Sequence, residues 1–164
     1  MQNNTTKLAV VMQYLSDSAH GISEYVNEAN DYHLKSFLKV VAKQRLKFIK
    51  ELRVACQEER IKPNVKDFGV HVGPLHQWFI DLKMKTHDNI SEVLKEEIVQ
   101  SDKVLMKKYD EALNQESNEK IKLLLDNQLN NIYLNNIYLT TQRETQYEEF
   151  DDDFTQELDI RQLN

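Results

Sequence analysis

The chain has 164 residues, a net charge of −6, and only three glycines and two prolines. A chain of this length forms one domain with a substantial core, and so few turn-forming residues argue against an all-β or α/β fold. The lone Cys56 excludes an internal disulfide framework and favours a reducing, cytoplasmic setting, since the first fifteen residues also lack the long apolar run of a signal peptide or membrane span.

The negative charge is concentrated at the C-terminus. Residues 143–164 hold eight acidic and two basic residues, whereas the first 142 residues hold nineteen of each. A neutral body lacks the basic surface typical of nucleic-acid binding. We therefore predict a bundle domain over residues 1–143 and an acidic tail over residues 144–164, with neither nucleic acid nor membrane as a partner.

Two amphipathic helices are predicted in the first third of the chain. Apolar residues recur at spacings of three and four along residues 8–29 and again along residues 34–55. Thr5 or Thr6 is expected to cap the first helix, and the Lys-Pro-Asn sequence at 62–64 to end the second. The short link between them makes the two helices antiparallel neighbours.

Two more stripes, along residues 94–112 and 121–139, predict a second antiparallel pair. Between the pairs, residues 73–83 begin with Gly-Pro and carry four large apolar side chains at helical spacing: Leu75, Trp78, Phe79 and Leu82. We predict an all-α fold, a ferritin-like antiparallel four-helix bundle with a short extra helix in the crossover between helices 2 and 3.

The sequence NNIYLNNIYL, at residues 130–139, repeats one five-residue word. A period of five matches neither a strand nor a helix, but the surrounding leucines favour a helix with Ile132, Asn135 or Asn136, and Leu139 directed inward. A helix would protect the segment from strand pairing, so we interpret the repeat as part of an ordinary helix.

A di-metal centre in a ferritin-like bundle needs Glu-x-x-His pairs that face the core. None of the five histidines follows a glutamate at that spacing. The nearest approach is Asp17, His20 and Glu24, on a face predicted to meet solvent, and Glu97 and Asp102 complete the set of weak candidates for an unorthodox metal site. We expect no metal and no other cofactor, with iron as the alternative.

The inward polar positions are predicted to be amides and hydroxyls: Ser18, Gln44 (or Arg45), Ser101, Gln128 and Asn135. Such groups satisfy one another by hydrogen bonds and fix helix register, but they are poor ligands for iron. A glycine-rich phosphate loop and a Cys-x-x-Cys pair are both absent from the sequence. With Cys56 predicted as a small buried residue, we expect no catalytic residues and favour a non-enzymatic protein.

Two charge patterns remain open. Lys35, Lys39, Lys43 and Lys47 form a ladder on the second helix, which is typical of a solvated face. In the tail, Tyr147, Phe150, Phe154 and Leu158 would share one helical stripe among the acidic residues. The tail is either a disordered solvating segment or an amphipathic segment that docks on the lysine ladder of its own chain or of a neighbour.

Three blocks, at residues 30–52, 73–83 and 101–113, resemble an uncharacterised bacterial family of ferritin-like four-helix-bundle proteins, a domain-of-unknown-function group. The resemblance extends over about residues 5–143. Its most specific part is the segment formed by Leu75, His76, Phe79, Ile80, Asp81, Leu82 and Lys83, and the block of Tyr109, Glu111, Ala112 and Leu113 is also close.

The resemblance implies a ferritin-like fold and a cytoplasmic bacterial protein with no settled activity. It also implies metal-ligand positions that many members fill with glutamate or histidine, and these positions are occupied here by His20, Val99 and Asn136. We therefore expect a non-enzymatic, metal-free bundle that acts through self-association or a protein partner, with a stress response as one expected setting. The alternatives are a di-iron binding or oxidase bundle with atypical ligands, and a scaffold that exposes Trp78 and Phe79.

Overall fold

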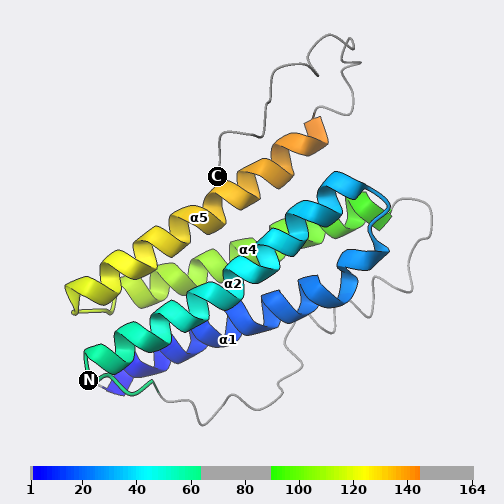
Figure 1. Ribbon diagram of the computed structural model, residues 1–164. Coiled ribbons are helices and arrows are strands. Elements are labelled where there is room, and N and C mark those ends of the chain that lie inside the picture. Colours follow the sequence, from blue (N-terminus) through cyan, green and yellow to red (C-terminus); the bar gives the residue numbers. More distant parts are fainter. Residues whose placement is uncertain (1, 64–89, 145–164) are drawn as a thin grey trace, which may run out of the picture.

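In the computed structural model, residues 2–63 and 90–144 are described, and within them the chain forms four α-helices and no strand (Figure 1). The helices are α1 (Gln2–Tyr25), α2 (Tyr32–Glu58), α4 (Ile90–Leu113) and α5 (Glu119–Glu144), and a 3-10 turn, η1 (Val26–Glu28), follows α1. The prediction of an all-α fold is confirmed. The predicted extra helix at 73–83 and the acidic tail beyond Glu144 lie outside the described residues.

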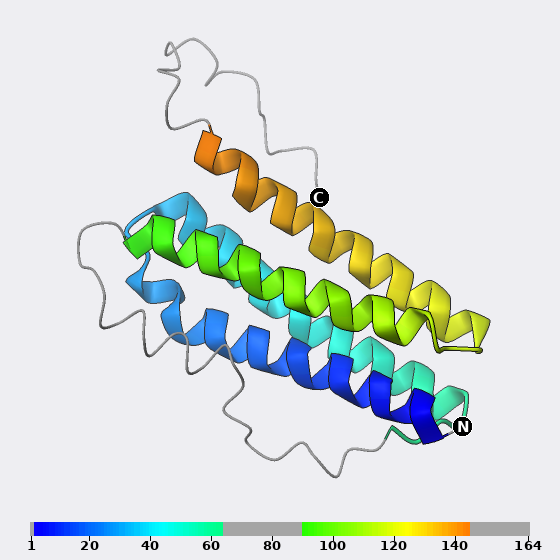
Figure 2. The ribbon, with the colours of Figure 1, turned by 180° about the vertical axis from the view of Figure 1, so that it is seen from behind.

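The four helices form a bundle in which α1 packs against α2 and α4, and α5 packs against the same two helices from the other side (Figures 1 and 2). Neighbouring helices run in opposite directions. Along α2 and α5, for example, Asn118 bonds Glu59 whereas Asn135 bonds Gln44, so partner positions fall on α2 as they rise on α5. None of the described helices is long and apolar enough to cross a membrane.

The core consists of two apolar clusters. One, which includes Leu15, Leu52 and Ile132, lies toward the start of α1, and the other, which includes Ile22, Val41 and Leu139, lies toward its end. Where the clusters meet, each helix contributes one buried polar residue: Ser18, Arg45, Asp102 and Asn136. We call these four residues the polar layer. The bundle core is thus apolar at both ends and polar at its middle.

The predicted apolar stripes are buried with two exceptions, Phe37 and Leu124, which are half-buried. Phe37 lies at the α2–α5 contact, where its ring meets that of Tyr138 with centroids 4.4 Å apart. Within the repeat, Asn136 rather than Asn135 is buried, and Ile132 and Leu139 are the apolar residues directed inward. The helical interpretation of the repeat is confirmed.

Side-chain caps fix two of the helix starts. The Asp31 carboxylate accepts a hydrogen bond from the Leu34 N–H at 2.9 Å, and the Asn118 side chain accepts from the N–H groups of Lys120 and Ile121. These bonds satisfy backbone donors that the first turn leaves unpaired. The prediction of a cap at Thr5 or Thr6 is wrong, because α1 begins at Gln2 and both threonines lie inside it.

The C-terminal end of α2 turns through a residue in the left-handed region. Arg60 has φ of 56°, and the Ile61 N–H donates back to the Cys56 carbonyl at 2.8 Å. This 6→1 bond is typical of a Schellman motif, in which glycine is the usual left-handed residue. The turn brings Ile61 back against the apolar cluster near Cys56.

Candidate functional site

An ion pair between diagonal helices lies at the centre of the polar layer. Nη2 of Arg45 on α2 donates to both carboxylate oxygens of Asp102 on α4, each at 2.8 Å, and both side chains are 0% exposed. Charged side chains this deeply buried are found only when paired. The pair joins two helices that are not neighbours, so it fixes how α2 and α4 are aligned along the bundle axis.

The pair is only partly satisfied. Nε and Nη1 of Arg45 are buried and have no hydrogen-bond partner within the described ranges. Burial raises the pKa of Asp102 above its usual value, and Arg45 opposes that shift by stabilising the carboxylate. Because desolvation of two charges offsets much of their attraction, such a pair contributes register more than stability.

The charge pair corrects the predicted core layer. Ser18, Gln128 and the alternative Arg45 are buried as predicted, but Ser101 is half-buried and its neighbour Asp102 points inward instead. Adjacent helical residues differ by about 100° in direction, so the error is a shift by one position. A layer of neutral amides and hydroxyls was expected, whereas the centre is ionic.

A hydrogen-bonded network extends from the polar layer toward the start of α5. The Tyr109 hydroxyl donates to Oε1 of Gln128 at 2.8 Å, and Nε2 of Gln128 donates to the Phe48 carbonyl at 3.2 Å and to the Glu51 carboxylate at 3.0 Å. Burial raises the pKa of Tyr109 far above its usual value, partly opposed by Arg45. Tyr109 therefore remains a neutral donor that holds α4, α5 and α2 together.

The asparagines of the repeat bond neighbouring helices. Nδ2 of Asn135 donates to the Gln44 side chain at 2.6 Å, and Nδ2 of Asn136 donates to the Val99 carbonyl at 3.0 Å. Val99 and Asn136 are two of the three positions that the resemblance singles out as ligand positions, and the structure brings them together. The contact is an amide–carbonyl hydrogen bond, which ties α5 to α4.

The five candidate metal ligands occupy different surroundings. Asp102 is buried against Arg45, Asp17 is half-buried and accepts from Gln13, Glu97 is half-buried, and His20 and Glu24 are exposed. Within residues 2–63 and 90–144, no three His, Cys, Asp or Glu side chains form a group that could hold a metal ion. The core of a ferritin-like di-metal centre needs several carboxylates, and a guanidinium at the centre does not fit a pair of cations.

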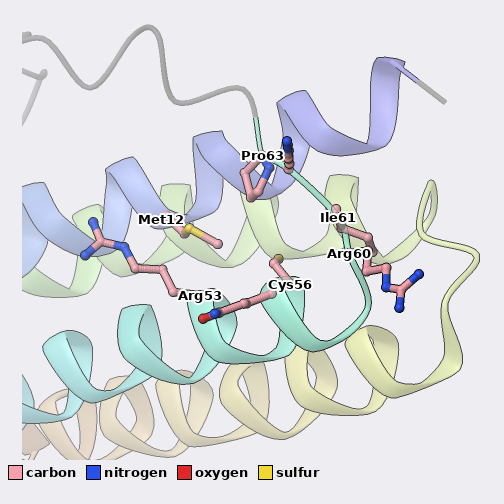
Figure 3. A pocket seen from close by; sticks show the side chains of 8 residues that line it. Met12, Arg53, Cys56, Arg60, Ile61 and Pro63 are labelled. Carbon is pink, nitrogen blue, oxygen red and sulfur yellow. The ribbon is translucent and has the colours of Figure 1, made fainter.

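A cavity of about 710 Å³ lies beside the end of α2 (Figure 3). Three of the residues that line it are cationic: Arg53, Arg60 and Lys62. The other lining residues are Met12, Cys56, Gln57, Ile61 and Pro63. Met12 and Cys56 point toward each other across it. Burial, with a smaller effect of Glu116, raises the pKa of Cys56 to about 11. Because the thiolate is the reactive form, the Cys56 thiol is a poor nucleophile at neutral pH.

The outward side of α5 is unusual for a surface. Tyr133, Leu134, Ile137 and Tyr138 are 55%, 62%, 40% and 39% exposed. We call these four residues the α5 patch. The sixteen residues from 127 to 142 contain no charged side chain at all. Depletion of charge together with enrichment in aromatic residues is the composition of a protein–protein interface.

The repeat itself explains the α5 patch. Five residues turn a helix by about 140° beyond a full rotation, so the two copies of Ile-Tyr-Leu cannot face the same way. The core takes Ile132 from the first copy and Leu139 from the second, which lie seven residues apart on one face. The four remaining apolar residues of the repeat are therefore directed outward.

The outward side of α2 has a different character. Between Tyr32 and Lys50 it carries five lysines at positions 35, 39, 43, 47 and 50, and this stretch contains no acidic residue. Lys39, Lys43 and Lys50 form no ion pair within the described part of the chain, and Lys47 pairs with Glu51 at 3.6 Å. Three aliphatic side chains are exposed on α2 as well: Val40, Leu46 and Val54.

Comparison with protein families assigns the chain to a group. A model described as a domain of unknown function, DUF2383, matches residues 3–115. The chain belongs to this family. No curated protein and no solved structure matches it. The DUF2383 match includes Arg45, Asp102 and Tyr109 and stops before α5 begins at Glu119, so the α5 patch lies beyond the matched range.

Proposed function

We propose that this DUF2383 chain is a non-enzymatic, ferritin-like bundle of the bacterial cytoplasm that acts by associating with a second copy of itself through the α5 patch. The order of the helices supports the ferritin-like arrangement, because two antiparallel pairs are joined by one long connection, between residues 59 and 89. The lone cysteine supports a cytoplasmic protein.

The observation that carries the proposal is the uncharged, apolar outward side of α5. Four large side chains within six residues are between 39% and 62% exposed. A helix that is apolar on its outward side as well as its inward side is expected to be buried on both. The exposure and composition of the α5 patch are thus typical of a protein–protein interface.

A second copy suits this surface better than a charged partner does. Symmetric dimers pair one patch with itself, so a patch with charge of a single sign would face the same charge on the second copy. The stretch 127–142 has none, and two α5 helices can therefore approach without repulsion. The aromatic rings of Tyr133 and Tyr138 supply contact area at little cost in conformational entropy.

The interior supports a structural role over a catalytic one. The buried charges of the polar layer are paired with each other. The side-chain amide of Gln128 donates to Glu51 and to a backbone carbonyl, and that of Asn136 donates to a backbone carbonyl. A guanidinium beside a bound cation would be repelled. Tight, stoichiometric uptake of ferrous iron by chelator-treated protein under anaerobic conditions would contradict the metal-free proposal and favour the di-iron alternative.

Association is tested with a matched pair of leucines. Leu134 and Leu123 lie on α5 with exposures of 62% and 64%, but only Leu134 belongs to the patch. We expect Leu134→Glu to shift the full-length protein from dimer to monomer in analytical ultracentrifugation, with a dissociation constant raised at least about a hundredfold, since a buried unpaired charge costs several kcal/mol. Leu123→Glu should leave the dimer intact. A wild-type protein that remains monomeric at high concentration contradicts the proposal.

A further inference from the structure

We propose that the outward face of α2 is the docking site for the acidic C-terminal segment of the same chain, residues 145–164. The face consists of Lys39, Lys43, Lys47 and Lys50 with the exposed Val40, Leu46 and Val54. This inference does not depend on the α5 patch, because it concerns a different helix and an intramolecular contact.

Charge complementarity is the first argument. The lysine-bearing part of α2, from Tyr32 to Lys50, is free of acidic residues, so three of its lysines have no counter-charge among the residues that the structure describes. Residues 145–164 hold seven acidic residues and one basic residue, a net charge of −6. Because the rest of the chain is neutral, no other segment carries a comparable negative charge.

The apolar residues of the two surfaces also match. Val40 and Val54 are 64% and 46% exposed, and Leu46 lies between them along the helix. Helical spacing places Tyr147, Phe150, Phe154 and Leu158 of the tail on one stripe, with acidic residues on both sides of it. An amphipathic helix recognises a groove through such regularly spaced apolar anchors and a charged rim.

The connection of the chain favours docking within one molecule. The pairings of Asn135 with Gln44 and of Tyr138 with Phe37 show that the end of α5 lies level with the start of α2. The tail follows α5 directly, so it starts near this end of α2 and has the length to run along α2 toward Val54. Val40 and Val54 are about 21 Å apart along the helix, and residues 147–158 span about 17 Å as a helix and more when extended. A short tether raises the effective concentration of the tail at this face to the millimolar range.

The experiment uses the full-length chain with a nitroxide on the tail. At helical spacing, position 156 falls opposite the apolar stripe of the tail, so Gln156→Cys places the label without disturbing the proposed contact. Cys56 is buried and burial raises its pKa, so it should react slowly with the reagent at neutral pH, and the label on an otherwise wild-type chain serves as the control. We expect the backbone amide signals of α2 from Val40 to Val54 to lose most of their intensity, while those around Val104 on the outward side of α4 keep theirs.

Two charge-matched triple variants test the lysines. Lys39→Gln/Lys43→Gln/Lys50→Gln should restore the α2 signals, whereas Lys62→Gln/Lys103→Gln/Lys107→Gln, with the same loss of charge elsewhere, should not. Absent broadening, equal broadening on α2 and α4, or broadening that both variants retain would overturn the proposal. Broadening seen only between an isotope-labelled chain and a separate nitroxide-labelled chain would assign the contact to a neighbour and overturn docking within one molecule. A monomer that shows the expected broadening would refute the α5 association alone.

Discussion

The centre of the core and the outward side of α5 each reverse the usual arrangement of polar and apolar residues. At the centre, Arg45 and Asp102 bury two charges completely, while at the surface the α5 patch leaves four large apolar side chains in water. Burying a charge is unfavourable unless it is paired, and exposing an apolar cluster is unfavourable unless it is later covered. The two buried charges are already paired with each other within one chain. The α5 patch lacks its cover, which is why we assign function to the surface and register to the core.

The largest effect is expected from breaking the buried pair. Arg45→Met leaves the Asp102 carboxylate buried alone, so the free energy of unfolding should fall by about 3–5 kcal/mol in urea titrations. The double variant Arg45→Met/Asp102→Leu should come within about 1 kcal/mol of wild type or exceed it, because it removes both desolvation penalties. As a control, Lys47→Met removes an exposed cation of α2 and should change stability by less than about 0.5 kcal/mol.

The loss in Arg45→Met should depend on pH. Arg45 lowers the pKa of Asp102 and burial raises it, so removing Arg45 raises the folded-state pKa further above the unfolded value. The folded state then binds the proton more tightly than the unfolded state, and the penalty grows as pH rises through this interval. The deficit should therefore be largest at neutral pH and shrink toward pH 4. A deficit equal to that of Lys47→Met, or one independent of pH, would contradict a fully buried ionic pair.

A smaller effect separates an inward tyrosine from an outward one. Tyr109→Phe leaves Oε1 of Gln128 buried without its donor and should cost about 1–2 kcal/mol of unfolding free energy. Tyr133→Phe removes the same hydroxyl from the α5 patch, where water replaces it, and should change stability by less than about 0.5 kcal/mol. Equal losses in the two variants would show that the hydroxyl of Tyr109 is not held by the core network.

The smallest effect concerns a surface ion pair. Glu111 lies within 2.9 Å of Lys7 and 3.1 Å of Lys108, and hydrogen bonds from these lysines lower its pKa. A lowered folded-state pKa contributes stability above the unfolded value, and that contribution is lost as pH falls through the folded value. Glu111→Gln should therefore be slightly less stable than Asp110→Asn at pH 7 and low salt. The difference should shrink as the pH falls through the lowered folded-state pKa of Glu111, and also in 1 M salt; a difference that persists in both conditions would show that the ion pair does not cause it.

The helices and their inward stripes could be predicted because apolar spacing of three and four survives in the sequence. Stripe residues such as Leu8, Leu15, Leu52, Ile98 and Leu105 are all buried. The layer between the clusters could not be predicted to the residue. Ser101 and Asp102 are adjacent in the chain, and the rotation of α4 about its own axis decides which of the two side chains meets Arg45.

The orientation of the repeat on α5 could be predicted in part. The apolar spacing predicted that Ile132 and Leu139 of the repeat face the core, but it left open which of Asn135 and Asn136 does. Burial of Ile132 and Leu139, which lie seven residues apart and share a face, confirms that prediction. Likewise Asn136, rather than Asn135, is the inward asparagine because it can reach the Val99 carbonyl on α4.

By itself the sequence determined that the protein is helical, that its helices pair through short links, and that its excess charge lies at the C-terminus, because periodicity, turn residues and charge are local properties. Only the tertiary structure decided that a cation of α2 and an anion of α4 meet at the centre, and that four large apolar side chains of α5 stay exposed. Those outcomes depend on how separate helices are rotated and aligned against one another. Packing between the helices fixes that rotation, and the sequence of a single helix does not determine it.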